Sequence, residues 1–106
     1  MLSFLTLTNA VFYQADTMAR YCEEYIKYIN LESNVDQYEA GVCSGYISSK
    51  IEVMELSEQL CHKDKLNLNN VVKEFILTVK DNNEAKEQSA TYVVVQVLQQ
   101  NFSCDE

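Results

Sequence analysis

The chain has 106 residues, which is the size of one domain with a single thin core. Its composition, 47% hydrophobic and 23% charged, is that of a folded globular protein and argues against disorder. Eight basic residues against sixteen acidic ones give a net charge of −8. This charge disfavours nucleic acid and anionic membrane as partners and favours a basic protein or a basic cleft, although acidity also serves simply to keep a small protein in solution.

Residues 1–15 are expected to form a separate N-terminal segment, either a remnant of a secretory signal peptide or an extension of the first helix. The stretch "MLSFLTLTNA" ends in a small residue, as signal peptides do, but it has no positively charged start, and threonines interrupt its apolar run. No run of about 18 apolar residues occurs in the sequence, so no transmembrane helix is expected. Residues 16–106 are expected to form a single helical domain.

The scarcity of turn-forming residues favours helices over strands. The sequence has no proline and only two glycines, Gly41 and Gly45, whereas an all-β domain of this size needs more turn formers. Asp16 or Thr17 is expected to cap a first helix. The apolar stripe of that helix contains Met18, Cys22, Tyr25 and Ile29. The polar stretch "NLESN" at residues 30–34 then interrupts the periodicity.

Two further helices follow this interruption. The second is expected to start near Val35 or Asp36 and to run to about Leu60. Its apolar positions include Tyr38, Val42, Tyr46 and Val53. Asn67 is a good N-cap for the third helix. The apolar face of the third helix contains Leu68, Val72, Phe75 and Val79.

The last segment, from about Glu84 to Phe102, carries conflicting signals. "TYVVVQV" is β-branched and aromatic enough for a strand, whereas the flanks "NEAKEQSA" and "LQQN" are good helix formers. A lone strand would have no partner to pair with, so we expect a helix that is buried on most sides.

The four cysteines decide how these helices are joined. Residues 43 to 61 on one helix would place Cys43 and Cys61 about 27 Å apart, at about 1.5 Å rise per residue. A disulfide needs Cα atoms within about 7 Å, so these two are not partners. Cys22 and Cys43 are equidistant from the polar break and therefore level in an antiparallel helix pair. Cys61 and Cys104 end the second and fourth helices, which share a pole in an up-and-down bundle.

The predicted fold is therefore all-α, a four-helix up-and-down bundle stapled by the disulfides Cys22–Cys43 and Cys61–Cys104. Gly41 and Gly45 lie four residues apart on one face of the second helix. Small residues there would let the neighbouring helix approach closely, which suits a short disulfide across the pair.

No catalytic or metal-binding constellation is apparent. No two cysteines have C-x-x-C spacing, and the only histidine, His62, directly follows Cys61 in a polar loop, where it is expected to be exposed. The acidic residues of "EE" at 23–24 and "ELSE" at 55–58 are typical of solvated helix faces. We therefore expect neither an enzyme nor a cofactor nor a metal.

Several segments together resemble one protein family. They are the cysteine of the first helix, "CSGYI" in the second, the cysteine that ends it, "NLNNVVKEFI" in the third and "ATYVVVQVLQQNFSC" in the fourth. In this order they resemble the Rap/Tai-type immunity proteins of bacterial type VI secretion, over residues 18–104. The resemblance implies a small, helical, disulfide-bonded periplasmic protein, commonly a homodimer. It also implies a function, which is to bind and block a peptidoglycan amidase toxin, a cysteine peptidase.

Two surfaces are candidates for contact with a partner. The polar connection after the third helix has acidic and amide groups that suit an enzyme cleft, although it is equally typical of a solvated turn. Its candidate toxin-binding residues are Asp81, Asn82, Asn83, Glu84 and Glu87. The tyrosines of the first helix, Tyr21, Tyr25 and Tyr28, either anchor an interface or lie at the edge of the core.

Homodimerisation is also predicted from the fourth helix, because "YVVVQV" offers more apolar surface than one side of a thin core can bury. Two other functions remain open. The first is a small periplasmic acid-stress chaperone, which would also be short, helical, acidic and disulfide-stapled. The second is a structural protein of the cell envelope without a toxin partner.

Overall fold

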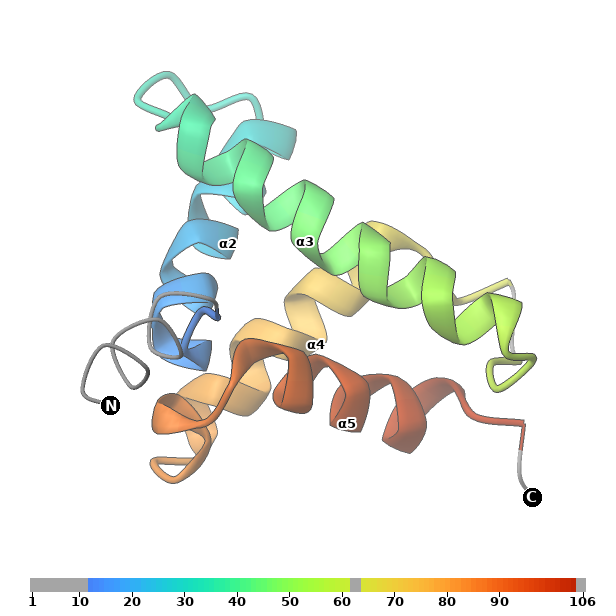
Figure 1. The fold of residues 1–106 in the computed structure, drawn as a ribbon. Helices are drawn as coiled ribbons and strands as arrows, with labels where there is room; N and C mark the ends of the chain where they lie inside the picture. Colours follow the sequence, from blue (N-terminus) through green and yellow to red (C-terminus); the bar gives the residue numbers. More distant parts are fainter. Residues whose placement is uncertain (1–11, 62–63, 105–106) are drawn as a thin grey trace, which may run out of the picture.

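A computed structural model describes residues 12–61 and 64–104, and the regular elements in these ranges are all helices (Figure 1). The α-helices are α2 (Ala15–Ile29), α3 (Gln37–Leu56), α4 (Leu68–Asp81) and α5 (Ala90–Phe102). A short 3-10 helix, η1 (Ala85–Glu87), lies between α4 and α5. The all-α prediction is confirmed for the described residues, and "TYVVVQV" is helical because its apolar side chains pack on three other helices.

Capping side chains hold the starts of α3 and α4. The side chain of Asp36 accepts a hydrogen bond from the backbone N–H of Glu39, 3.0 Å away, at the start of α3. At the start of α4, the side chain of Asn67 accepts a hydrogen bond from the backbone N–H of Asn70, 2.9 Å away. The predicted cap of the first helix is wrong, since α2 begins at Ala15 and its N-cap, Gln14, makes no side-chain cap bond.

The tertiary structure explains the early start of α2. The backbone N–H of Ala15 donates to the carbonyl of Gln88 at 2.8 Å, and that of Ala90 donates to the carbonyl of Tyr13 at the same distance. These bonds form an isolated antiparallel bridge between Gln14 and Ser89. Backbone pairing with a distant segment therefore supplies at this helix end what a capping side chain supplies elsewhere.

The second helix is shorter than predicted, because α3 ends at Leu56 rather than near Leu60. Glu58 adopts a left-handed backbone with φ of 60°, which turns the chain. Leu60 then pairs with Ser103, and the N–H of Cys61 donates to the carbonyl of Phe102 at 2.7 Å. The last segment is likewise divided, into η1 and α5, by extended residues that pair with the start of α2.

One apolar core joins the four helices, and no polar or charged residue among those described is buried in it. Each helix contributes one face. The largest fully buried side chains are Phe75, Met18, Ile47, Leu98, Val71, Val72, Val93, Val94 and Val97. The disulfide between α2 and α3 is also fully buried.

Both predicted disulfides are confirmed. Cys22 pairs with Cys43 and Cys61 pairs with Cys104, with Cα atoms 5.0 Å and 4.8 Å apart. The up-and-down bundle is not confirmed, because the helices run in clearly different directions in Figure 1, with α2 steeply inclined to α5. The second disulfide joins two extended segments beyond the helix ends, so it does not require α3 and α5 to lie parallel.

The prediction for the two glycines is wrong. Gly41 and Gly45 are both exposed, and a Cβ atom placed on either would meet no other part of the protein within 4 Å. The close approach of α2 and α3 at the disulfide therefore does not depend on them. Ala40, Cys43 and Ile47 occupy the buried face of α3 instead.

Candidate functional site

The five residues predicted to bind a toxin lie on one exposed loop between α4 and α5. Asp81 is the last residue of α4, and Asn82 is its C-cap. Asn83 and Glu84 follow, and Glu87 is the last residue of η1. All five are exposed to solvent. We refer to residues 81–89 as the acidic loop.

The structure assigns Asn82 a role inside this loop. Its side-chain oxygen accepts hydrogen bonds from the backbone N–H groups of Glu84 and Ala85, at 3.0 Å and 3.3 Å. Its backbone carbonyl accepts a second bond from Ala85 at 3.0 Å. Asn82 therefore shapes the turn into η1, and the methyl group of Ala85 is buried against the core.

Lys86 was not predicted from the sequence, yet it organises the loop. Its ammonium group donates to the carbonyls of Val79 and Lys80, at 3.0 Å and 3.2 Å, and to the side-chain oxygen of Asn83 at 3.3 Å. The two carbonyls belong to the last turn of α4, where helical partners are missing and the helix dipole is negative. A lysine shortly after a helix end is a weak sequence signal, because cations are favoured at such ends in general.

The far end of the loop is tied to the start of α2 by the two backbone bonds at Ala15 and Ala90. The loop is therefore held at both ends and braced across its middle. Three carboxylates project from it, those of Asp81, Glu84 and Glu87. None of these three side chains has a hydrogen bond or an ion pair with another residue of the described ranges. They are available to a partner.

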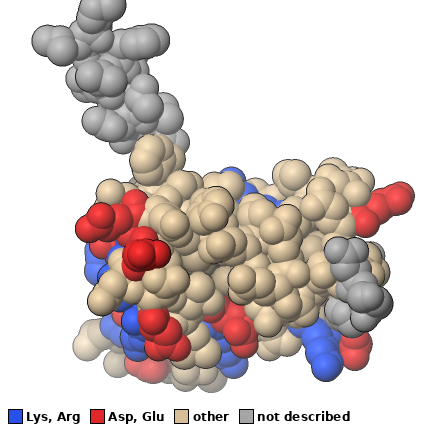
Figure 2. Space-filling model, turned by 90° about the horizontal axis from the view of Figure 1, so that it is seen from below, with Lys and Arg blue, Asp and Glu red and all other residues tan. Residues whose placement is uncertain are grey.

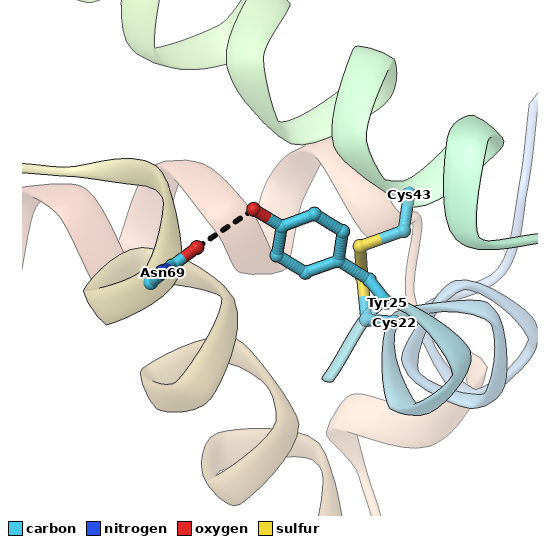
Figure 3. The surroundings of a disulfide bond; sticks show 4 residues. All are labelled: Cys22, Tyr25, Cys43 and Asn69. Carbon is cyan, nitrogen blue, oxygen red and sulfur yellow. Dashed lines mark hydrogen bonds between the residues drawn. A yellow bond between two sulfur atoms is a disulfide. The ribbon is translucent and has the colours of Figure 1, made fainter. Parts of the chain in front are cut away.

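The three tyrosines of α2 have different environments. Tyr21 is half-buried, with its ring edge-on to Tyr13 at 5.9 Å between centroids. Tyr25 donates its hydroxyl to the side-chain oxygen of Asn69 on α4 at 2.7 Å, beside the buried disulfide (Figure 3). Burial, followed by the neighbouring Tyr28, raises the pKa of Tyr25. Tyr28 is 55% exposed, so it is the tyrosine of this helix that a partner can reach most easily.

The turn between α2 and α3 is held by a carboxylate. Glu24 accepts from the backbone N–H of Asp36 and from the ammonium of Lys27, each at 2.9 Å. These bonds, in that order of importance, lower the pKa of Glu24, and the same pair raises the pKa of Lys27. Glu24 therefore serves the hairpin and is not a free surface acid.

Most of the apolar surface on which the predicted dimer through α5 rested is buried within the single chain. Val93, Val94, Val97 and Leu98 are fully buried, because α2, α3 and α4 all pack against α5, whereas Val95 is partly buried. On the outer face Tyr92 is 51% exposed. No residue of α5 is charged. Seen from the side of α5, the molecule shows a broad area without charged side chains, bordered by acidic and basic ones (Figure 2).

All four cysteines are in disulfides, so none is a free thiol nucleophile. No group of three or more histidine, cysteine or acidic residues within residues 12–61 and 64–104 could hold a metal ion. His62 lies outside the described residues, as do residues 1–11 of the predicted N-terminal segment. No helix of the described part is long and apolar enough to cross a membrane.

Comparison with protein families accounts for the pattern of cysteines and helices. The family model of the Rap1a immunity proteins matches residues 13–104, which include all four helices and both disulfides. The chain belongs to the Rap1a immunity proteins. Membership indicates a toxin immunity protein that binds a toxin partner and acts as a non-enzymatic inhibitor. No curated protein and no solved structure matches the chain.

Proposed function

We propose that this Rap1a immunity protein acts in the periplasm, where it binds and inhibits a cognate peptidoglycan amidase toxin of type VI secretion and so protects the cell that produces it. The family membership supports the immunity role. The two disulfides support an oxidising compartment such as the periplasm.

The acidic loop is the part that we propose enters the catalytic cleft of the toxin. The observation that carries this proposal is the combination of two features: the carboxylates of Asp81, Glu84 and Glu87 have no partner among the described residues, and Lys86 braces the backbone that bears them. A loop that is already ordered loses little conformational entropy on binding. Its charge would also attract a basic cleft and speed association.

The test compares two triple variants that each remove three negative charges. In the first, Asp81, Glu84 and Glu87 are changed to alanine. In the second, the control, exposed acids elsewhere are changed, namely Glu32, Glu52 and Asp64. We expect the loop variant to lose toxin affinity by at least about thirtyfold, since a charged group buried in an interface contributes about 2–5 kcal/mol. The control variant should change only the association rate, and by a few-fold at low salt.

The measurements are the binding kinetics against candidate peptidoglycan amidase toxins and the survival of cells that express such a toxin together with each variant. Equal effects of the two variants would show that only the overall charge matters. An unchanged affinity in the loop variant would reject the acidic loop as the inhibitory element.

We also propose that the protein is a homodimer, as its resemblance to the family implies, but through a surface other than the valines of α5. The second half of α3 has two exposed apolar side chains, Val53 at 60% and Leu56 at 80%. Burial of such side chains in an isologous contact would remove apolar surface from water.

A further inference from the structure

A groove between α2 and α3 lies at the opposite end of α2 from the acidic loop (Figure 1). Its volume is about 280 Å³, enough for one side chain of a partner. Its walls are uncharged and include two aromatic rings. The residues that line it are Tyr25, Tyr28, Gln37, Ala40, Gly41 and Ser44.

The two rings form a partly fixed aromatic wall. The ring centroids of Tyr25 and Tyr28 are 6.5 Å apart, with their planes inclined by 33°. The hydrogen bond to Asn69 holds Tyr25 in place (Figure 3), whereas Tyr28 is more than half exposed. Aromatic rings attract cations, and they stack best with the planar guanidinium group.

Gly41 keeps the groove open. A glycine inside a helix costs about 0.5–1 kcal/mol relative to alanine. Nothing within the described structure requires glycine here, since its φ is not positive and a Cβ would meet no atom within 4 Å. Any longer side chain at this position would project into the space that a ligand would use. Gly45 is also exposed and also has room for a side chain, but it does not line the groove.

The charges around the groove favour a cation. Of the three acidic residues in the turn and the first part of α3, Glu39 is already paired with Arg20 of α2, 3.2 Å away, and Lys27 of α2 is paired with Glu24 at 2.9 Å. The other two, Glu32 and Asp36, have no ion pair with another described residue, and the whole chain carries a net charge of −8. Gln37 and Ser44 add side-chain oxygen atoms to the lining, which can accept N–H groups.

We propose that this groove binds an arginine side chain presented by a partner protein, with the guanidinium stacked beside Tyr28 and its stem lying over Gly41. This inference does not rest on the proposed amidase inhibition, because the groove and the acidic loop are separate surfaces. It assigns the protein a second recognition site, selective for one kind of side chain.

The test uses the folded, oxidised full chain labelled with ¹⁵N and three short peptides of the form acetyl-Gly-X-Gly-amide. In these peptides X is arginine, its uncharged analogue citrulline, or norleucine. We expect saturable shifts of the Gly41 and Ser44 amide resonances with the arginine peptide, and binding at least about tenfold weaker with the other two, which corresponds to about 1.4 kcal/mol. Equal binding of the citrulline or norleucine peptide, or shifts spread over the acidic surface without saturation, would overturn the proposal.

Matched variants locate the site. Gly41→Leu should abolish the saturable shifts, and Gly45→Leu should leave the affinity within about twofold, since both side chains have room on the surface. Tyr28→Leu, at an exposed position, should weaken binding about two- to fivefold, as expected when an exposed cation–π contact is lost. Circular dichroism confirms that each variant is folded. A similar loss in the two leucine variants of the glycines would refute the assignment to this groove.

Discussion

Lys86 provides a sharp test of how the acidic loop is built. Lys86→Met keeps the length of the side chain and removes the ammonium group, which donates to Val79, Lys80 and Asn83. A cation at a helix C-terminus contributes about 0.3–1 kcal/mol, and a charged hydrogen bond about 1.5–3 kcal/mol where water is excluded. Lys86 is half-buried, so we expect the free energy of unfolding to fall by about 1–2 kcal/mol in total.

Urea denaturation followed by circular dichroism measures this loss. With a slope of about 1–3 kcal/mol per molar urea, the midpoint should fall by roughly 0.3–2 M. Lys73→Met is the matched control, since Lys73 is exposed on α4 and its ammonium has no partner among the described residues. Equal midpoints for the two variants would refute the bracing role of Lys86.

The same variant separates charge from rigidity in toxin binding. Removing the Lys86 ammonium makes the loop more negative, so charge alone predicts faster association with a basic cleft. Loss of the brace predicts weaker binding, because the loop must then be ordered on association. We expect the loss of the brace to outweigh the added charge. If ordering the loop costs about 1.4 kcal/mol, the affinity falls about tenfold. Tighter binding by Lys86→Met would show that the loop acts through its charge and not through its shape.

Three further predictions follow from the structure. A reducing agent should open Cys61–Cys104 before the fully buried disulfide between α2 and α3, because Cys104 is exposed. Alkylation and mass spectrometry measure the order, and simultaneous opening of the two disulfides would contradict the prediction. The pKa of Glu24 is lowered in the folded protein, so its carboxylate stabilises the fold above the unfolded pKa, and this stabilisation is lost as the pH falls through the folded pKa. The melting temperature of Glu24→Gln should therefore fall less between pH 7 and about pH 3 than that of the native protein. Equal falls in the two proteins would contradict this. Val53→Asp and Leu56→Asp together should convert a dimer into a folded monomer in analytical ultracentrifugation, and a variant that still sediments as a dimer would exclude this face.

The local features of the fold could be predicted from the sequence. Asn67 caps α4, as expected for a residue whose side chain bonds to nearby N–H groups, and α3 begins at Gln37, close to the predicted start. The disulfide pairs could also be predicted, because the positions of cysteines along successive helices limit which can meet. The five candidate residues of the acidic loop are exposed, as a polar connection between two apolar segments indicates.

Other features depended on contacts between distant segments. α2 begins at Ala15 because its N–H bonds to Gln88, and no local pattern signals such a bond. The apolar excess of α5 suggested a dimer, yet three neighbouring helices bury three of its four valines within the single chain. The glycines of α3 suggested a close helix contact, yet they face solvent.

The sequence by itself determined the helical class, the cap of α4, the disulfide pairs and the family, because these depend on short-range hydrogen bonds, on periodicity and on the order of a few cysteines. Only the tertiary structure decided how the helices cross, how far each extends and which surface remains free. Those outcomes depend on the joint packing of four apolar faces and on single long-range bonds, such as that from the N–H of Ala15 to the carbonyl of Gln88. Spacing along the chain does not encode such contacts.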